Sequence, residues 1–360
     1  MSQWTEDKYN LTAQEQEVLR KRSAQRRAER KKAYRRRQRR FFGCVALALA
    51  AIILLLVLIL SGGRGEKEDE VQEQEIVPEM PDVEETPKVE LPAVPTASGE
   101  SVILGDEIDS AYAIVVERET GKIVASKNPT ATIYPASMTK VLALIVAVEE
   151  IEDLNEKFTM TAEIIDPVYR EGATTTGIKS GEAVALEELL YAMILPSGAD
   201  AADALAIAAC GSTEAFAEKM NEKVAELGLS ESAHFANANG LHDENQYCSV
   251  RDMAMIFEYA MRDETCRKVL STMYFTTTPT EQHPEGVSYT NLYLYRIENR
   301  DMNGATVLAG KTGYVAASGS CIASCGAAAD GSEYIVVTAD ASGSWKAIYD
   351  HIDLYGTYAK

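Results

Sequence analysis

The chain has 360 residues, with 35 Lys and Arg against 55 Asp and Glu and a formal net charge of -20. This length allows one large domain with attachments, or two small domains. The acidic balance argues against a nucleic-acid partner, because phosphate binding needs clustered cations. The charge is also unevenly placed: Arg and Lys crowd positions 20–40, whereas the chain after residue 65 is acidic on balance.

An unbroken apolar run, Phe41 to Leu60, follows the basic segment. Its length suits a bilayer-spanning helix. The apolar core of a secretory signal peptide is usually only about 7–15 residues and ends at a small-residue cleavage site, which residues 61–70 do not offer. We therefore expect a retained signal anchor at 41–60 in the cell membrane. Residues 1–40 then form a basic cytoplasmic tail, and the rest of the chain is extracytoplasmic.

The basic tail has a second interpretation, as a patch that binds anionic lipid or nucleic acid. We favour the simpler role of setting membrane topology. Residues 61–100 are expected to form an acidic linker, because positions 66–99 are rich in Glu, Pro and Val and show neither a helical nor a strand period. Residues 101–360 then form the folded domain.

The predicted elements of this domain begin with a hairpin, Tyr112–Arg118 and Ile123–Ser126, around a Glu-Thr-Gly turn. A second hairpin is predicted near the other end, at Gly319–Ala328 and Glu333–Ala339. Apolar residues at helical spacing predict helices between and after the hairpins, at Ser137–Glu150, Leu186–Ile194, Asp200–Ala209, Thr213–Leu227, Val250–Met261 and Ser344–Tyr355. The pattern predicts an α+β fold: one antiparallel sheet assembled from both ends, flanked by helices and with a helical region inserted.

An S-x-x-K motif, Ser137 to Lys140, opens a helix whose next eight residues are apolar on every face, so the helix is expected to be buried. The first turn places Ser137 beside unpaired N–H groups that favour a developing oxyanion. Lys140 lies one turn on, within reach of Ser137. Desolvation and a nearby cation would lower the pKa of this amine, so that it acts as a base. The alternative is an N-cap serine followed by a snorkelling lysine.

A K-T-G motif follows far downstream, at Lys311, Thr312 and Gly313. The cation and hydroxyl suit recognition of a carboxylate, and the glycine lets a substrate backbone approach closely. S-x-x-K and K-T-G in this order are among the marks of penicillin-binding proteins and serine β-lactamases.

Other hydrolase signatures are missing from the sequence. The chain has 4 His and neither G-x-S-x-G nor H-E-x-x-H, which argues against a Ser-His-Asp triad and against a zinc site. We expect no metal and no cofactor, and we interpret His242 as a packing residue of its loop. Cys321 and Cys325, four residues apart on one expected strand, would be roughly 13 Å apart and too distant to form a disulfide with each other.

From about residue 106 to 358 the chain resembles the D-alanyl-D-alanine carboxypeptidases, the low-molecular-weight penicillin-binding proteins of serine peptidase family S11. Besides SMTK and KTG, the matching stretches are TGKIVASKNPTATIYPASMTK, GIKSGEAVALEELLYAMILPSGADAADALA, FANANGLHDENQYCSVRDMA and AGKTGY. The resemblance implies the penicillin-binding protein/β-lactamase-like fold. It also implies a membrane-anchored enzyme that removes the terminal D-alanine from peptidoglycan stem peptides ending in D-Ala-D-Ala, with β-lactam antibiotics as inhibitors.

The resemblance also implies roles for individual residues. Ser137 would be the nucleophile and Lys140 its base. Ser197 corresponds to the serine of the family's S-x-N motif, which relays protons to the leaving group.

The remaining implied roles concern substrate binding. Lys311 and Thr312 would hold the terminal carboxylate of the substrate, next to Gly313. The backbone N–H groups of Ser137 and Tyr314 would form the oxyanion hole.

One residue departs from the family pattern, because S-G-N is replaced by Ser197, Gly198 and Ala199. The missing amide normally helps to hold the lysine and the substrate's peptide carbonyl, so weaker catalysis is expected. Two alternative functions stay open: a D,D-endopeptidase that cuts cross-links, and a catalytically weak sensor that binds penicillin or cell wall. A class A β-lactamase is less favoured, because S-D-N and a Glu-x-x-x-Asn motif before Ser197 are missing.

Overall fold

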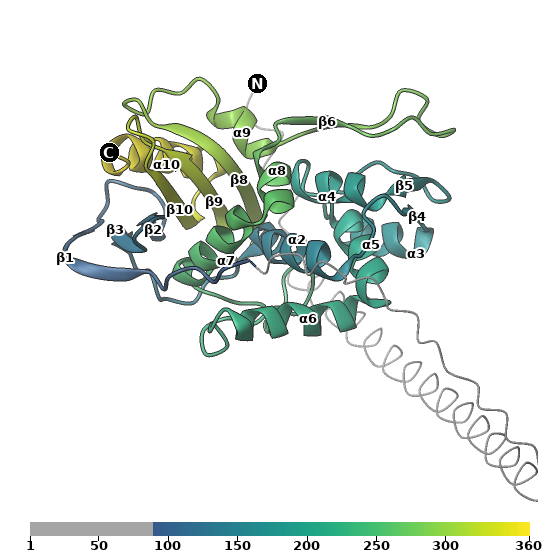
Figure 1. Ribbon diagram of the computed structural model, residues 1–360, viewed down its shortest axis with the longest axis horizontal. Coiled ribbons are helices and arrows are strands. Elements are labelled where there is room, and N and C mark those ends of the chain that lie inside the picture. The colour runs from purple at the N-terminus through teal and green to yellow at the C-terminus, as the bar shows by residue number, and fades with distance from the viewer. Residues whose placement is uncertain (1–88) are drawn as a thin grey trace, which may run out of the picture. The chain divides into compact units, whose positions relative to one another are not determined.

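The computed structural model describes residues 89–360 (Figure 1). The expected cytoplasmic tail, the apolar run 41–60 and most of the linker lie outside the described residues. Within residues 89–360, no helix combines the length and the apolar character that crossing a membrane requires.

A six-stranded sheet in the order β1-β3-β2-β10-β9-β8 forms one side of the domain. Its strands are β1 (Thr96–Ile103), β2 (Tyr112–Glu117), β3 (Lys122–Lys127), β8 (Thr306–Val315), β9 (Gly319–Ala327) and β10 (Glu333–Ala341). The two predicted hairpins are confirmed as β2–β3 and β9–β10, and they join where β2 pairs antiparallel with β10. The sheet is therefore assembled from both ends of the domain.

The sheet differs from the prediction at β1. This strand pairs with β3 in parallel, so the sheet is mixed and the expectation of a purely antiparallel sheet is wrong for this pair. β1 also begins at Thr96, inside the stretch that was expected to be linker up to residue 100. Seven of its 8 residues are exposed, so burial imposes no apolar alternation by which the sequence would reveal a strand.

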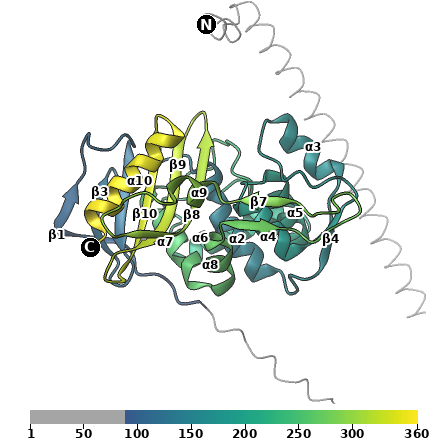
Figure 2. The ribbon, with the colours of Figure 1, turned by 90° about the horizontal axis from the view of Figure 1, so that it is seen from above.

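Apolar side chains alternate between the two faces of the central strands, and each face is covered by helices. Ile114 and Ile335 pack into the larger core, with α7 (Val250–Arg262) and α8 (Glu264–Ser271) on that side. Val115 and Val336 pack into a smaller core beneath α9 (Leu292–Ile297) and α10 (Ser344–Tyr358). Figures 1 and 2 show α10 lying along the sheet.

The inserted helices form the other side of the domain (Figure 2). They are α2 (Thr139–Glu150), α3 (Ala162–Arg170), α4 (Leu186–Ile194), α5 (Ala199–Cys210) and α6 (Thr213–Glu226), with short two-stranded sheets of β4 (Lys157–Thr159) with β5 (Ala183–Ala185) and β6 (Tyr274–Thr276) with β7 (Ser288–Thr290). Helix α2 is buried from Thr139 to Ala147 and contacts α4, α5, α6, α7 and α8. Its first turn is therefore held firmly at the boundary between helices and sheet.

Candidate active site

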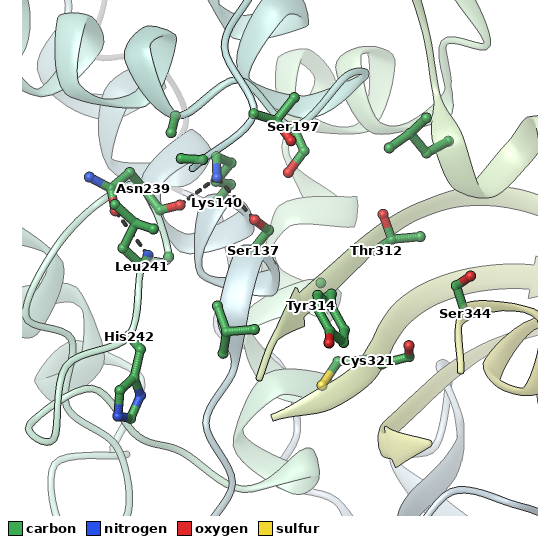
Figure 3. A pocket seen from close by; sticks show the side chains of 18 of the residues that line it. Ser137, Lys140, Ser197, Asn239, Leu241, His242, Thr312, Tyr314, Cys321 and Ser344 are labelled. Carbon is green, nitrogen blue, oxygen red and sulfur yellow. Dashed lines mark hydrogen bonds between the residues drawn. The ribbon is translucent and has the colours of Figure 1, made fainter. Parts of the chain in front are cut away.

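A cavity of about 660 Å³ lies where the first turn of α2, the start of α5, strand β8 and the loop 239–242 meet (Figure 3). Six of the seven predicted site residues line it: Ser137, Lys140, Ser197, Thr312, Gly313 and Tyr314. The seventh, Lys311, lies buried next to Ser197. The structure thus brings together residues from three distant segments of the sequence.

Ser137 lies in a 3-10 turn, η1 (Ala136–Met138), directly before α2. Lys140 donates a hydrogen bond from Nζ to Ser137 Oγ at 3.1 Å and a second one to the backbone carbonyl of Asn239. The side chain is only 1% exposed. Burial lowers the pKa of the Lys140 amine to about 8, although the carboxylates of Asp203 and Asp200 act in the opposite direction. An amine with this pKa is roughly one-tenth unprotonated at pH 7, and it lies within reach of the serine proton.

Ser197 lies just before α5, and its hydroxyl accepts a hydrogen bond from Lys311 Nζ at 2.8 Å. Lys311 also donates to the carbonyl of Thr312 at 2.9 Å and is 2% exposed. Burial, together with the nearby charge of Lys140, holds the pKa of Lys311 well below its ordinary value. The site thus contains two hydrogen-bonded serine–lysine pairs, Ser137 with Lys140 and Ser197 with Lys311.

Two glycines allow the backbone segments of the site to approach each other. At Gly313, an added Cβ would lie 3.1 Å from the backbone nitrogen of Ser137. At Gly240, an added Cβ would lie 2.4 Å from the carbonyl oxygen of Ala136, and φ is +76°. Strand β8 and the loop after Asn239 therefore close on the serine turn from opposite sides, which a larger residue would prevent.

Two non-glycine residues at the serines have left-handed backbone conformations. Ala136, directly before Ser137, has φ of 48°, and Ser197 has φ of 71°. Such a conformation costs an ordinary residue roughly 1–2 kcal/mol. The surrounding segments stabilise these conformations, which aim both hydroxyls at the cavity.

The sequence motifs did not point to several residues around the cavity. Asn239 and Asp203 form a hydrogen-bonded pair behind Lys140, and Arg296 of α9 contributes a cation to the cavity wall. One signal for Asp203 was available: it is a charged residue in an Ala-rich helix, one turn after Ala199. His242 lies at the cavity and packs edge-on against Tyr134, with ring centroids 4.8 Å apart.

The described part of the domain offers little else of catalytic character. Its cysteines are free thiols, and four of the five are buried. Between residues 89 and 360, no group of three or more His, Cys, Asp and Glu side chains is arranged to hold a metal ion.

A serine beside a buried lysine, a second serine–lysine pair and a K-T-G strand next to them define a class of protein, that of the penicillin-binding proteins and serine β-lactamases. The family model for the D-alanyl-D-alanine carboxypeptidases, peptidase S11, matches residues 97–343. The chain belongs to this family.

Characterised relatives match part of the domain. The chain is 32% identical over 160 residues to the D-alanyl-D-alanine carboxypeptidase DacF of Bacillus subtilis, which covers 44% of this chain and 41% of that protein. It is 34% identical over 164 residues to DacA of Escherichia coli, which covers 44% of this chain and 40% of the relative. The matched segments thus span only about two-fifths of these relatives.

Solved structures show the same fold. The Streptomyces K15 DD-transpeptidase matches 69% of this chain and 97% of its own with a TM-score of 0.61 at 24% identity. A D-alanyl-D-alanine carboxypeptidase from Mycobacterium tuberculosis matches 73% and 94% with a TM-score of 0.60 at 23% identity. These similarities show an α+β fold of the penicillin-binding protein type, with a mixed sheet and a helical insertion.

Proposed function

We propose that the protein removes the terminal D-alanine from peptidoglycan stem peptides ending in D-Ala-D-Ala, through an acyl-enzyme on Ser137. The observation that carries the proposal is the 3.1 Å hydrogen bond from Lys140 Nζ to Ser137 Oγ. It joins a nucleophile to an amine whose pKa of about 8 lets it accept a proton near neutral pH. Family membership supports the same reaction.

In the acylation step, Ser137 Oγ attacks the carbonyl carbon of the penultimate D-alanine, and its proton passes to Lys140 Nζ. The developing oxyanion would accept hydrogen bonds from the backbone N–H groups of Ser137 and Tyr314. Losing one such donor commonly costs about 10²–10³ in turnover. The C–N bond to the terminal D-alanine then breaks, and the proton reaches the leaving nitrogen with Ser197 as relay.

In the deacylation step, a water molecule attacks the ester carbonyl on Ser137. The bond between Ser137 Oγ and the acyl carbon breaks, and the serine regains its proton. The shortened stem peptide leaves with a new carboxylate. Lys140 is again the neighbouring base, because it is the titratable group hydrogen-bonded to Ser137.

The terminal carboxylate of the substrate would lie beside β8. Thr312 lines the cavity there, and Lys311 Nζ lies behind it, 2.9 Å from the Thr312 carbonyl oxygen. Arg296 adds a second cation to the same cavity. We propose that Thr312 donates the direct hydrogen bond, while Lys311 provides positive potential from its buried position.

Acylation by benzylpenicillin tests the proposal, because the β-lactam carbonyl takes the place of the substrate carbonyl. Intact-mass measurement of the full-length protein in detergent should show one adduct, which Ser137→Ala loses and the exposed control Ser271→Ala keeps. The protein should also release D-alanine from a pentapeptide ending in D-Ala-D-Ala. An adduct that survives Ser137→Ala would disprove the assignment of the nucleophile.

The alternative functions give different products. An endopeptidase would cleave cross-linked dimers faster than it releases D-alanine from the pentapeptide. A sensor would form the penicillin adduct but turn over neither substrate. Release of D-alanine from the pentapeptide with many turnovers would exclude the sensor, and release faster than the cleavage of cross-linked dimers would exclude the endopeptidase.

We also propose that the apolar run Phe41 to Leu60 anchors the protein in the cell membrane, with residues 1–40 cytoplasmic and the catalytic domain extracytoplasmic. This proposal is supported by the length of the run and by the basic segment that precedes it. Such an anchor would keep the enzyme next to its substrate in the cell wall.

A further inference from the structure

Asp203 lies on α5, one turn beyond Ala199, and is hydrogen-bonded to the loop that holds Lys140. Its two carboxylate oxygens accept hydrogen bonds from Nδ2 of Asn239 at 2.9 and 3.2 Å. The Oδ1 atom of Asn239 accepts a hydrogen bond from the backbone N–H of Leu241 at 2.9 Å. Both ends of the Asn239 amide are thus satisfied, which fixes the orientation of this residue.

The backbone carbonyl of Asn239 is the second acceptor for Lys140. Figure 3 shows Lys140 between this carbonyl and the Ser137 hydroxyl, with a hydrogen bond to each. The contacts form a continuous path from Asp203 through Asn239 and Lys140 to Ser137. The side chain of Ala199, which lines the cavity from the start of α5, is a methyl group and cannot hydrogen-bond.

Asp203 also acts on Lys140 through its negative charge. The side chains of Lys140 and Lys311 are both buried, and Asp200 and Asp203 are the carboxylates whose charges act on Lys140. Asp200 is engaged elsewhere, because it accepts hydrogen bonds from the backbone and hydroxyl of Thr176.

Asp203 is itself surrounded by several groups. Lys140 faces it from α2, Asp200 from α5 and Glu171 from the turn after α3. Burial raises the pKa of the Asp203 carboxyl to about 6, so it is ionised around and above neutral pH.

We propose that Asp203 is a positioning residue for Lys140: it fixes, through Asn239, the carbonyl that holds the lysine beside Ser137, and its negative charge balances the buried ammonium. This inference rests on the proposed function, because it concerns the base for acylation of Ser137. In this role, Asp203 supplies from α5 the hydrogen-bonding support for Lys140 that the methyl group of Ala199 cannot provide.

The test separates the hydrogen bond from the charge. Asp203→Asn keeps an oxygen for Asn239 but removes the charge, which lowers the pKa of Lys140. The acid limb of the pH profile for acylation by benzylpenicillin should move down by roughly one pH unit, the effect of one neighbouring charge in a partly buried site. The rate on the high-pH plateau should stay within about threefold, since Asn239 keeps its partner.

Asp203→Ala removes both the charge and the hydrogen bond. Its plateau rate should fall roughly tenfold, the consequence of about one lost hydrogen bond to a charged group. In an Asn239→Ala background the same substitution should leave the plateau unchanged, because the path through the amide is already broken. Asp203→Glu keeps the charge and should keep the wild-type acid limb, and Asp166→Asn, an exposed carboxylate on α3, is the matched control.

The outcomes distinguish this inference from the function on which it rests. A wild-type protein that benzylpenicillin does not acylate would overturn the proposed function. A wild type that is acylated, together with an Asp203→Asn variant whose acid limb has not moved, would overturn the role of Asp203. A second measurement is independent of activity: in ε-¹³C-lysine-labelled full-length protein, the Lys140 resonance should titrate at lower pH in Asp203→Asn, and an unchanged titration would likewise overturn the role.

Discussion

Lys140 carries the pH dependence that the site should display. Its pKa is about 8 because the side chain is buried, and only the neutral amine can accept the Ser137 proton. The rate of acylation should therefore rise with pH and level off above about pH 8. A profile for benzylpenicillin between pH 5 and 10 measures this midpoint, and a flat profile over that range would contradict the role of Lys140 as base.

Lys140→Arg should keep the positive charge but lose the base, because guanidinium does not deprotonate in proteins. General-base catalysis contributes typically 10²–10⁴-fold, so we expect a loss of about that size in the acylation rate constant. Lys346→Arg, an exposed lysine on α10, serves as the matched control. Acylation of Lys140→Arg at a rate near that of the wild type would rule out this mechanism.

Ala199→Asn tests whether position 199 and Asp203 share one task. If Asp203 already holds Lys140 through Asn239, an amide at 199 should help little in the wild type. It should recover more in Asp203→Ala, by roughly two- to tenfold, the net worth of one hydrogen bond. Acylation rates of the four variants form the double-mutant cycle, and strictly additive effects would show that the two positions act independently.

At the residue scale, the sequence predicted those site residues that lie within short motifs. Ser137 and Lys140 share one turn, and Lys311 to Gly313 are consecutive, so local spacing carries their chemistry. The pair of Asp203 with Asn239 joins α5 to a distant loop, and such a contact is not encoded in the spacing of either segment. Only the tertiary structure could reveal this pair.

At the scale of elements, predictability followed the regularity of the apolar pattern. The predicted helix Leu186–Ile194 matches α4, because its apolar residues keep a regular spacing against the core. Helix α3 was missed, since it is short and contains Pro167. Strand β8 was also missed, because Gly310 and the K-T-G residues interrupt its apolar alternation.

His351 of α10 is hydrogen-bonded to residues of neighbouring elements. Its buried ring should make the free energy of unfolding depend on pH. The imidazole is completely buried and hydrogen-bonded to Tyr293, Ser324 and Thr338. Burial lowers the pKa of His351 to about 3. The unfolded chain takes up this proton below about pH 6.5 and the folded one does not, so the free energy of unfolding should fall as the pH drops from 6.5 towards 3.

The contribution of His351 should amount to on the order of 3 kcal/mol between pH 7 and pH 4. Urea unfolding at the two pH values measures it by comparison with His351→Gln, in which the difference should shrink, whereas His234→Gln at the surface should leave it unchanged. The wild type gives a direct check by NMR: titration of the His351 ring near pH 6.5 would contradict the buried, neutral state.

At the scale of the whole molecule, composition predicts a division of the chain whose first parts lie outside the described residues 89–360. A basic segment, an apolar run and an acidic stretch precede the folded domain in the sequence, and the family match begins at residue 97. The parallel strand β1 at this boundary could not be predicted, because its side chains are nearly all exposed.

The proposed topology predicts a specific protease pattern. Protease added to cells without their outer layers should degrade the catalytic domain and leave a short fragment that contains residues 1–60. An antibody against the Arg-rich tail should detect this fragment while the membrane is intact. When the membrane is permeabilised, the protease reaches the tail and the fragment should disappear. A freely secreted product that begins after Leu60 would show instead that the apolar run is a cleaved signal.

The pairing of β2 with β10 has a consequence for when activity can first arise. Val115 lies opposite Val336, so the centre of the sheet cannot form until nearly the whole domain has been synthesised. The K-T-G strand reaches Ser137 only within that sheet, and contacts so distant in sequence form slowly because a long loop must close first. A chain emerging N-terminus first, even one long past Ser137 and Lys140, would therefore carry its nucleophile without an assembled site, and the hydrolase would stay inactive until its biogenesis is complete.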